Sequence, residues 1–580
     1  MANTLTVSET QEAMTSHQEK KKLVSRDPAR EVVETIVFVV VLVLLLKLFV
    51  TEAFVIPTGS MAETLYGYQK LITCPKCGHL FPVNSHDEVE ANQATRQRHP
   101  LVGYTCPNCR YMHRDLNHGL PEKNNSGDRV LVLKPLYHVR PPHRGDVVVF
   151  KYPEAPQENH VPANYIKRAM GFGGETVAIH RGDLFVTRSL AYPEDNPLFP
   201  RPERAVDLWR PEYRYPNSAH AEELFRASRD AGFTNKVPGG FEIVRKGEQQ
   251  LLADRRIVWD NDKQPKELVG IGLPRWQIVG AEGRWKTDND KQPRAFAHSG
   301  DELDWITYKH LVWKLDTNKR RVPWRWPDPE GAKPVPGPID NMLGYNAGIE
   351  WNPVLRQPQS RDESRDSLRD ATMWVGDLIL ECEVEMSAGS EVVLELTRGT
   401  SRFQAKFGNG QVSLARIGAL GPEFGQPTRP CRVQAGTYQL RFANVDCRLW
   451  VWVDGQLIDF GDEALYSPVE PATFHPDDLH NKEGYTQDDI DRPASIGARG
   501  AVASIRHIKL FRDIYYTREL GVGDHSGADI FYVQPGHYLC LGDNSAQSSD
   551  SRKWGVVPER LLLGKAVFVF FPLGRVGFIK

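Results

Sequence analysis

Four of the eight cysteines in this 580-residue chain form two Cys-x-x-Cys pairs, Cys74 with Cys77 and Cys106 with Cys109. Four thiolates in two such turns suit the tetrahedral coordination of zinc, and we expect a structural zinc ribbon here. The alternative is a set of disulfides or a redox pair, which an exported location would favour. The residue types and their spacing leave both readings open.

A second group with chemical potential is Ser60, in the sequence Pro57-Thr-Gly-Ser-Met-Ala-Glu-Thr-Leu65. Gly59 permits a tight backbone that can present the serine hydroxyl. A serine in a turn is usually structural, so this motif alone does not predict a nucleophile.

Three further motifs follow in order: Gly127-Asp-Arg-Val-Leu-Val132, Tyr165-Ile-Lys-Arg-Ala-Met-Gly171 and Gly542-Asp-Asn-Ser-Ala-Gln-Ser-Ser-Asp-Ser-Arg552. With the Ser60 turn and the apolar segment before it, they make the chain resemble bacterial signal peptidase I, a family of Ser/Lys serine proteases. The resemblance covers the apolar segment, the region to residue 186, and residues 531–572. It implies an antiparallel β core that removes signal peptides after small residues, without a cofactor for catalysis.

The resemblance also assigns roles to single residues. Ser60 becomes the nucleophile and Lys167 its general base, while Thr58, where the family usually has serine, joins the Ser60 backbone N–H in the oxyanion hole. Ser548 falls where the family orients the lysine. The remaining matched residues would support the site: Asp543, Asn544, Asp550 and Arg552.

The proposed base needs a strongly perturbed pKa. A lysine can take a proton from serine only when it is neutral. With an ordinary pKa of about 10.4, the site must lower the value by about 3 units, or about 4 kcal/mol, to work near pH 7.4. Burial against apolar walls supplies such a shift, and a hydroxyl such as that of Ser548 can orient the amine without adding negative charge.

One segment departs from a soluble composition: residues 36–46 are wholly apolar. We expect a single transmembrane helix over 31–51, because a span needs about 20 residues. A basic flank precedes it, which by the positive-inside rule keeps residues 1–30 in the cytoplasm and places the catalytic domain on the outer face of the plasma membrane: Lys20, Lys21, Lys22, Arg26 and Arg30. A cleaved signal peptide is the alternative, although no small-x-small site follows the apolar run.

The fold class we expect is mainly β. Runs at 129–133, 146–150, 175–179 and 565–570 predict strands of the catalytic core. The core is expected to be divided by large insertions. The expected segments are 52–73, 123–190 and 518–580 for the core, 74–122 for the zinc-ribbon-like insertion, 191–365 for an irregular insertion and 366–517 for a β-sandwich.

Alternation from Leu378 to Met386, with Glu381, Glu383 and Glu385 on the opposite face, predicts a half-buried antiparallel strand of that sandwich. Two turns, Gly408-Asn-Gly410 and Asp454-Gly455, predict hairpins. The region is similar to concanavalin-like lectin and glucanase sandwiches, which implies carbohydrate as a partner of this part.

The partners we expect are preproteins with signal peptides and the lipid bilayer. A net charge of -2 gives no pull toward nucleic acid, so we expect none. The alternative function is a membrane-anchored carbohydrate-binding or scaffold protein with an idle peptidase core. A self-cleaving Ser/Lys repressor is a third class, but it would need a DNA-binding module where the apolar segment stands.

Overall fold

The computed structural model describes residues 28–92, 95–115, 119–152, 162–190, 218–233, 236–265, 274–280, 283–314, 333–360, 374–418, 424–467, 485–518 and 528–580. The chain forms two compact units, Met1–Glu52 and Ala53–Lys580. The predicted cytoplasmic segment over 1–30 lies almost wholly outside the described residues, and residues 191–217 and 315–332 lie wholly outside them.

The first unit contains α1 (Pro28–Leu45) and a π-helical turn, Leu46–Val50. The apolar side chains of this segment are largely exposed. Among the residues that the structure describes, no helix combines the length and the apolarity that crossing a bilayer requires. The transmembrane helix predicted over 31–51 is therefore not confirmed.

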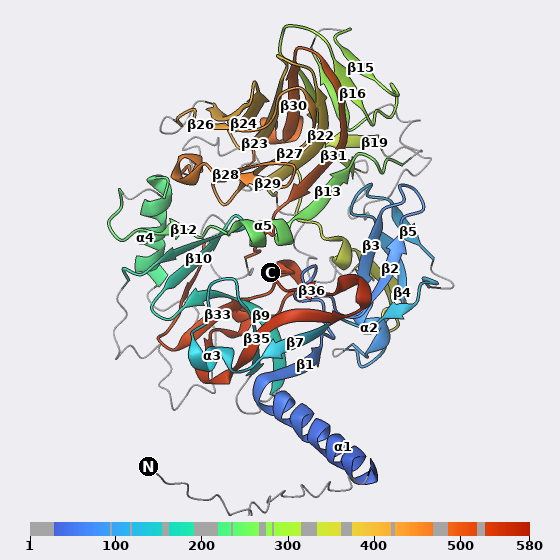
Figure 1. Ribbon diagram of the computed structural model, residues 1–580, viewed down its shortest axis with the longest axis vertical. Coiled ribbons are helices and arrows are strands. Elements are labelled where there is room, and N and C mark those ends of the chain that lie inside the picture. Colours follow the sequence, from blue (N-terminus) through green and yellow to red (C-terminus); the bar gives the residue numbers. More distant parts are fainter. Residues whose placement is uncertain are drawn as a thin grey trace, which may run out of the picture. The chain divides into compact units, whose positions relative to one another are not determined.

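One antiparallel sheet contains three of the four strands predicted for the core (Figure 1). Its strands, in spatial order, are β1 (Thr51–Val55), β7 (Arg129–Leu133), β35 (Leu562–Phe571), β8 (Val147–Tyr152), β9 (Ala163–Phe172), β33 (His537–Leu541) and β34 (Val557–Pro558), with β36 (Gly577–Phe578) paired to β35. The strands predicted at 129–133, 146–150 and 565–570 are confirmed. Valine-rich runs such as β8 form strands because branched side chains pack well on a pleated sheet whose faces are buried.

A smaller sheet carries the fourth predicted core strand. Its order is β12 (Glu242–Ile243), β11 (Asp183–Thr187), β10 (Thr176–His180) and β32 (Asp529–Tyr532). The antiparallel pairing of β10 with β32 joins residues from both ends of the divided core.

The cysteine-rich region contains two small sheets. One has the order β3 (Leu80–Asn84), β2 (Gln69–Thr73) and β6 (Asn124–Asn125); the other has the order β21 (Gln357–Ser360), β20 (Gly348–Asn352), β4 (Leu101–Thr105) and β5 (Met112–Arg114). Residues from the large insertion therefore complete a sheet of the cysteine-rich region.

Two larger sheets form the predicted sandwich. One contains β15 (Trp285–Thr287), β16 (Phe296–His298), β31 (Val502–Arg512), β22 (Leu378–Met386), β27 (Gly436–Val445), β28 (Arg448–Val453) and β29 (Gln456–Ile458), with β13 (Arg256–Asp260) paired to β31. The other contains β14 (Trp276–Val279), β17 (Asp304–Tyr308), β30 (Ala494–Arg499), β23 (Glu391–Arg398), β24 (Ser401–Gly408), β25 (Gln411–Ile417) and β26 (Thr428–Pro430). Side chains of both sheets share one hydrophobic core.

The sandwich extends beyond its predicted boundaries. Strands β13 to β17 lie within 256–308, in the part expected to be irregular, yet they add to both sheets. The alternation predicted for β22 is confirmed by its burial pattern, and the hairpin turns have positive φ at Asn409, Gly410, Asp454 and Gly455. A separate pair of strands, β18 (Leu311–Lys314) and β19 (Lys333–Pro336), follows β17.

Helices are few and short in the described part of the second unit, so the mainly β prediction is confirmed. The α-helices are α2 (His86–Val89), α3 (Leu136–Val139), α4 (Ser218–Asp230), α5 (Glu248–Asp254), α7 (Gln487–Asp491) and α8 (Ser551–Trp554). The 3-10 turns are η5 (Gly344–Asn346), η6 (Gly461–Ala464), η8 (Ser545–Gln547), η9 (Glu559–Leu561) and η10 (Leu573–Arg575).

Candidate active site

Ser60 lies on a turn shortly after β1 and is partly exposed. The carbonyl oxygen of Ser60 accepts a hydrogen bond from the backbone N–H of Asn544 at 3.1 Å. At Gly59 a Cβ would lie 2.0 Å from Cε1 of Tyr345, so the close packing of this ring requires glycine.

Lys167 lies on β9 and reaches Ser60 across 107 positions of sequence. Its Nζ donates hydrogen bonds to Ser60 Oγ at 2.7 Å and to the carbonyl oxygen of Ile166 at 2.9 Å. The side chain is buried, and this desolvation lowers the pKa of Lys167 to about 8, against the opposing charges of Asp550 and Asp543. The structure thus places the Lys167 amine next to the Ser60 hydroxyl, and burial shifts the pKa of that amine in the predicted direction.

The two carboxylates nearest this lysine are each paired with an arginine. Arg168 donates from Nε and Nη2 to Asp543 at 2.8 and 2.6 Å. Arg552 donates to Asp550 in the same two-bond arrangement, at 2.9 and 2.7 Å. Burial raises the pKa of both carboxyls, but the arginine charges outweigh it and hold each pKa below its ordinary value.

Asn544 contacts the nucleophile turn directly. Its side-chain Nδ2 donates to the carbonyl oxygen of Gly59 at 2.9 Å, and its backbone N–H bonds to Ser60 as described above. Asn544 is 2% exposed, so these bonds are not exchanged with solvent. The loop after β33 therefore fixes the backbone on both sides of the Gly59–Ser60 peptide.

Ser548 and Thr58 lie near the site without showing their predicted contacts. Ser548 is buried, and its Oγ has no hydrogen bond of ordinary geometry to a described residue, but its interaction with Asp550 helps to lower the pKa of that carboxyl. It packs against Gly542, where a Cβ would come within 2.2 Å of Ser548 Oγ. Thr58 is exposed, two residues before Ser60. Their roles in orienting the lysine and in the oxyanion hole stay predictions.

The four paired cysteines come together as one cluster. The Sγ atoms of Cys74, Cys77, Cys106 and Cys109 all lie within 4.8 Å of one another. The Cys74–Cys109 and Cys77–Cys106 Sγ distances are both 3.7 Å. A tetrahedron with Zn–S bonds of about 2.3 Å has S–S edges of about 3.8 Å. Bonded sulfurs would be about 2.05 Å apart, so the arrangement fits a shared metal better than disulfides.

The sequence reasoning missed three residues that hold the site together. Asp128 accepts from the Tyr66 backbone N–H and from Arg575 Nε, both at 2.9 Å, and so fixes the chain after the nucleophile. Arg168 binds Asp543, and its position directly after Lys167 in the third motif was the only indication of a role. Asp254 of α5 is fully buried 3.7 Å from Arg168, and burial raises its pKa. No motif marked it.

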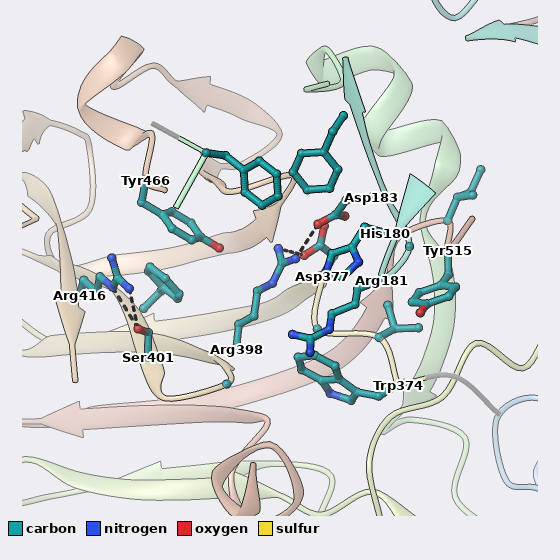
Figure 2. Close-up of a pocket in the computed structure, with 18 residues that line it drawn as sticks. His180, Arg181, Asp183, Trp374, Asp377, Arg398, Ser401, Arg416, Tyr466 and Tyr515 are labelled. Atoms are coloured by element: carbon teal, nitrogen blue, oxygen red, sulfur yellow. Dashed lines mark hydrogen bonds and ion pairs between the residues drawn. The ribbon is translucent and has the colours of Figure 1, made fainter. Parts of the chain in front are cut away.

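A cavity of about 80 Å³ lies elsewhere, between the β10–β11 hairpin and the sandwich. Figure 2 shows Arg398 between Asp183 and Asp377, with Arg416 bound to Ser401. None of the proposed catalytic residues lines this cavity. It is therefore separate from the Ser60–Lys167 pair.

The chain matches the family model of "Signal peptidase, peptidase S26" over residues 117–228 and 455–571. Signal peptidase I of Pseudomonas aeruginosa is 30% identical over 169 residues, covering 27% of this chain and 56% of that protein. Signal peptidase I of Pseudomonas fluorescens is 30% identical over 165 residues, covering 28% and 55%. The chain thus spans about half the length of these curated relatives.

Among solved structures, a Bacillus subtilis protein of unknown function with a galectin-like fold is similar at 8% identity and a TM-score of 0.23, covering 44% of this chain and 98% of that one. The chain carries a peptidase domain similar to signal peptidase I, which is a hydrolase domain. Residues 229–454, between the two matched segments, lie outside the family match.

Proposed function

We propose that the chain is a membrane-bound serine endopeptidase that removes N-terminal signal peptides from exported proteins through a Ser60/Lys167 dyad. The observation that carries this proposal is the hydrogen bond of 2.7 Å between Lys167 Nζ and Ser60 Oγ, with the lysine 3% exposed. The similarity of the surrounding segments to signal peptidase I supports the same reading.

The reaction follows from this geometry. Neutral Lys167 takes the proton of the Ser60 hydroxyl as Oγ attacks the carbonyl carbon before the cut. The tetrahedral oxyanion is held by the Ser60 N–H and the Thr58 hydroxyl, and each such donor contributes about 2.7–4 kcal/mol. The C–N bond then breaks, and the leaving amine takes the proton from the lysine. Lys167 next deprotonates a water, which hydrolyses the ester and frees Ser60.

The supporting residues favour the neutral form of the lysine. Asp543 and Asp550 would raise the pKa of Lys167 if they acted as free charges. Their two-bond pairs with Arg168 and Arg552 offset that effect, so burial dominates. Ser548 is proposed to orient the lysine amine, since its buried hydroxyl interacts with Asp550, whose charge acts on the pKa of Lys167.

We further propose that the exposed apolar segment of α1 and the turn after it associates with the bilayer, with residues 1–30 in the cytoplasm and the protease on the outer face of the plasma membrane. The exposure of Val32, Phe38, Leu44 and Phe49 supports this assignment, because large exposed apolar surface marks an interaction site. A signal peptide held at the same interface would reach Ser60 at a high effective concentration.

The cysteine cluster is proposed to hold one structural zinc ion. Its four sulfurs are spaced as tetrahedral ligands. The ion would fix the turns that carry Cys74 and Cys106 and takes no part in the cleavage step.

The test is cleavage of a preprotein with an Ala-x-Ala site by full-length protein in detergent, with the new N-terminus sequenced. Ser60→Ala and Lys167→Ala should each abolish cleavage. Lys151→Ala removes an exposed lysine from the neighbouring strand β8 and should retain it. No cleavage by folded wild type would favour the carbohydrate-binding alternative with an idle core, whereas cleavage by Ser60→Ala would contradict the dyad.

A further inference from the structure

A short segment of the large insertion packs directly behind the proposed nucleophile. The side chains of Asn346, from η5, and Asn544 form a reciprocal amide pair across 198 positions of sequence, with N–O distances of 2.7 and 2.8 Å. Both side chains are buried, at 3% and 2% exposure. The pair is therefore shielded from solvent, where a hydrogen bond is electrostatically stronger and costly to leave unmade.

The bond to Asn346 determines how Asn544 meets the nucleophile turn. One N–H of the Asn544 amide goes to Asn346 Oδ1 and the other to the Gly59 carbonyl oxygen. The Asn544 carbonyl oxygen accepts from Asn346 Nδ2, which fixes which way the amide faces. Without Asn346, rotation about the last side-chain bond of Asn544 would carry its N–H away from Gly59.

Tyr345 supports the same turn from the next position. Its ring stacks on Tyr66 with centroids 5.4 Å apart, and its hydroxyl donates to the carbonyl oxygen of Tyr68 at 3.2 Å. It occupies the space that Gly59 leaves open. Tyr345 thus contacts the turn directly, whereas Asn346 reaches it through Asn544.

The segment is anchored in the cysteine-rich region rather than in the catalytic sheet. The Thr105 N–H donates to the Ala347 carbonyl oxygen at 2.9 Å, and β20 then pairs with β4. A Cβ at Gly344 would lie 2.8 Å from the ring of Pro107, which directly follows Cys106. The segment that carries Tyr345 and Asn346 is therefore held by β4, the strand that leads into the second Cys-x-x-Cys pair.

We propose that Asn346 is a positioning residue for the dyad: by fixing the Asn544 amide, it holds the Gly59–Ser60 backbone so that Ser60 Oγ meets Lys167 Nζ. This inference rests on the proposed function. Asn346 does not touch the substrate, so it should affect the rate of the chemical step and not substrate binding. A misplacement of about 1 Å in a reacting group can cost about 100-fold in rate.

The experiment compares steady-state cleavage of the same preprotein by wild type, Asn346→Ala, Asn346→Asp and a control, Asn352→Ala, in the full-length protein. Asn352 is a buried amide of the same segment that bonds Gln359 at 3.0 Å, away from Ser60. We expect Asn346→Ala to lower kcat by about 10- to 100-fold at nearly unchanged KM. Asn346→Asp removes the donor to the Asn544 carbonyl oxygen and buries an unpaired carboxylate, so it should not recover the loss. Asn352→Ala should retain the wild-type kcat.

Coupling to Asn544 gives a second readout. If Asn346 acts through Asn544, the double variant Asn346→Ala/Asn544→Ala should be no slower than Asn544→Ala alone. Additive losses, an equal loss of kcat in Asn352→Ala, or an unchanged kcat in Asn346→Ala would each overturn the inference while leaving the dyad intact. Cleavage by Ser60→Ala in the same assay would instead overturn the proposed function, and the inference with it.

Discussion

At the scale of single residues, the account depends on the charge state of one buried amine. Lys167 lies near two carboxylates that oppose the lowering of its pKa, and both are neutralised by buried arginines. An unpaired carboxylate at either position would restore the ammonium form. The arginines therefore serve the chemistry of the lysine without contacting the reacting atoms.

The pH dependence of cleavage follows from that pKa. Because burial lowers the pKa of Lys167 to about 8, the neutral and competent fraction grows as the pH rises toward 8 and levels off above it. We expect kcat/KM to rise about tenfold per pH unit on the acidic side. An initial-rate profile from pH 5 to pH 10 measures it, and a midpoint near 10 would contradict a desolvated base.

Ser548→Ala separates an orienting role from a structural one. The hydroxyl interacts with the buried Asp550 carboxylate, so its removal should lower the free energy of unfolding by about 1–2 kcal/mol. If it orients the amine of Lys167, kcat should fall by at least about tenfold. Urea unfolding and steady-state kinetics measure the two effects, and unchanged kcat would rule out the orienting role.

At the scale of elements, α8 and the loop before it join two distant parts of the chain. Asp550 caps α8 and pairs with Arg552. Arg552 also donates to the carbonyl oxygen of Thr517 at 2.7 Å and to that of Ser545 at 2.7 Å. The point at which the chain returns from the sandwich is thus fixed to the loop that carries Asn544.

Asp550→Asn should therefore lower the free energy of unfolding of the protein as well as disturb the candidate active site. The change leaves the buried Arg552 charge without its partner, which costs about 3–5 kcal/mol in the free energy of unfolding. Asp459→Asn, at an ion pair with Arg448 in which the carboxylate side chain is 66% exposed, is the matched control and should cost less than about 1 kcal/mol. Urea midpoints compare them, and equal effects would contradict a structural role for the buried pair.

The cysteine-rich element makes a prediction about metal. We expect elemental analysis to find one zinc per chain in the purified protein, and Cys74→Ser to lose it. Cys431→Ser changes a cysteine outside the cluster and should retain the metal. Zinc removal should also lower kcat, because β4 anchors the segment that carries Asn346. Two disulfides among the four cysteines, found by mass spectrometry, would contradict this assignment.

At the scale of the whole molecule, what the sequence could predict was local or carried by motifs. The strand from Leu378 to Met386 was predictable because its alternation is a period of two, and the catalytic motifs because four of them occur in order. The limits of the sandwich were not, since β13 to β17 join its sheets only through pairing with strands far along the chain. No local pattern indicates which distant strand will be a neighbour.

The residues of the candidate site also divide into those that motifs could predict and those that distant contacts determine. Ser60, Lys167 and Asn544 could be matched to motifs, but Asn346 lies 198 positions from Asn544 and does not differ in type from a surface asparagine. Asp254 was equally hidden, because its burial arises from the packing of α5 against Arg168. Contacts that an insertion makes with the catalytic core became visible only in three dimensions.

The most direct measurement of the central claim is the location of the acyl-enzyme. Full-length protein is mixed with a preprotein, quenched in acid within the first turnover, and digested for mass spectrometry. We predict an ester between the carboxyl end of the signal peptide and Ser60, absent in Ser60→Ala and much slower to form in Lys167→Ala. An adduct on another residue, or cleavage that persists in Ser60→Ala, would contradict the dyad.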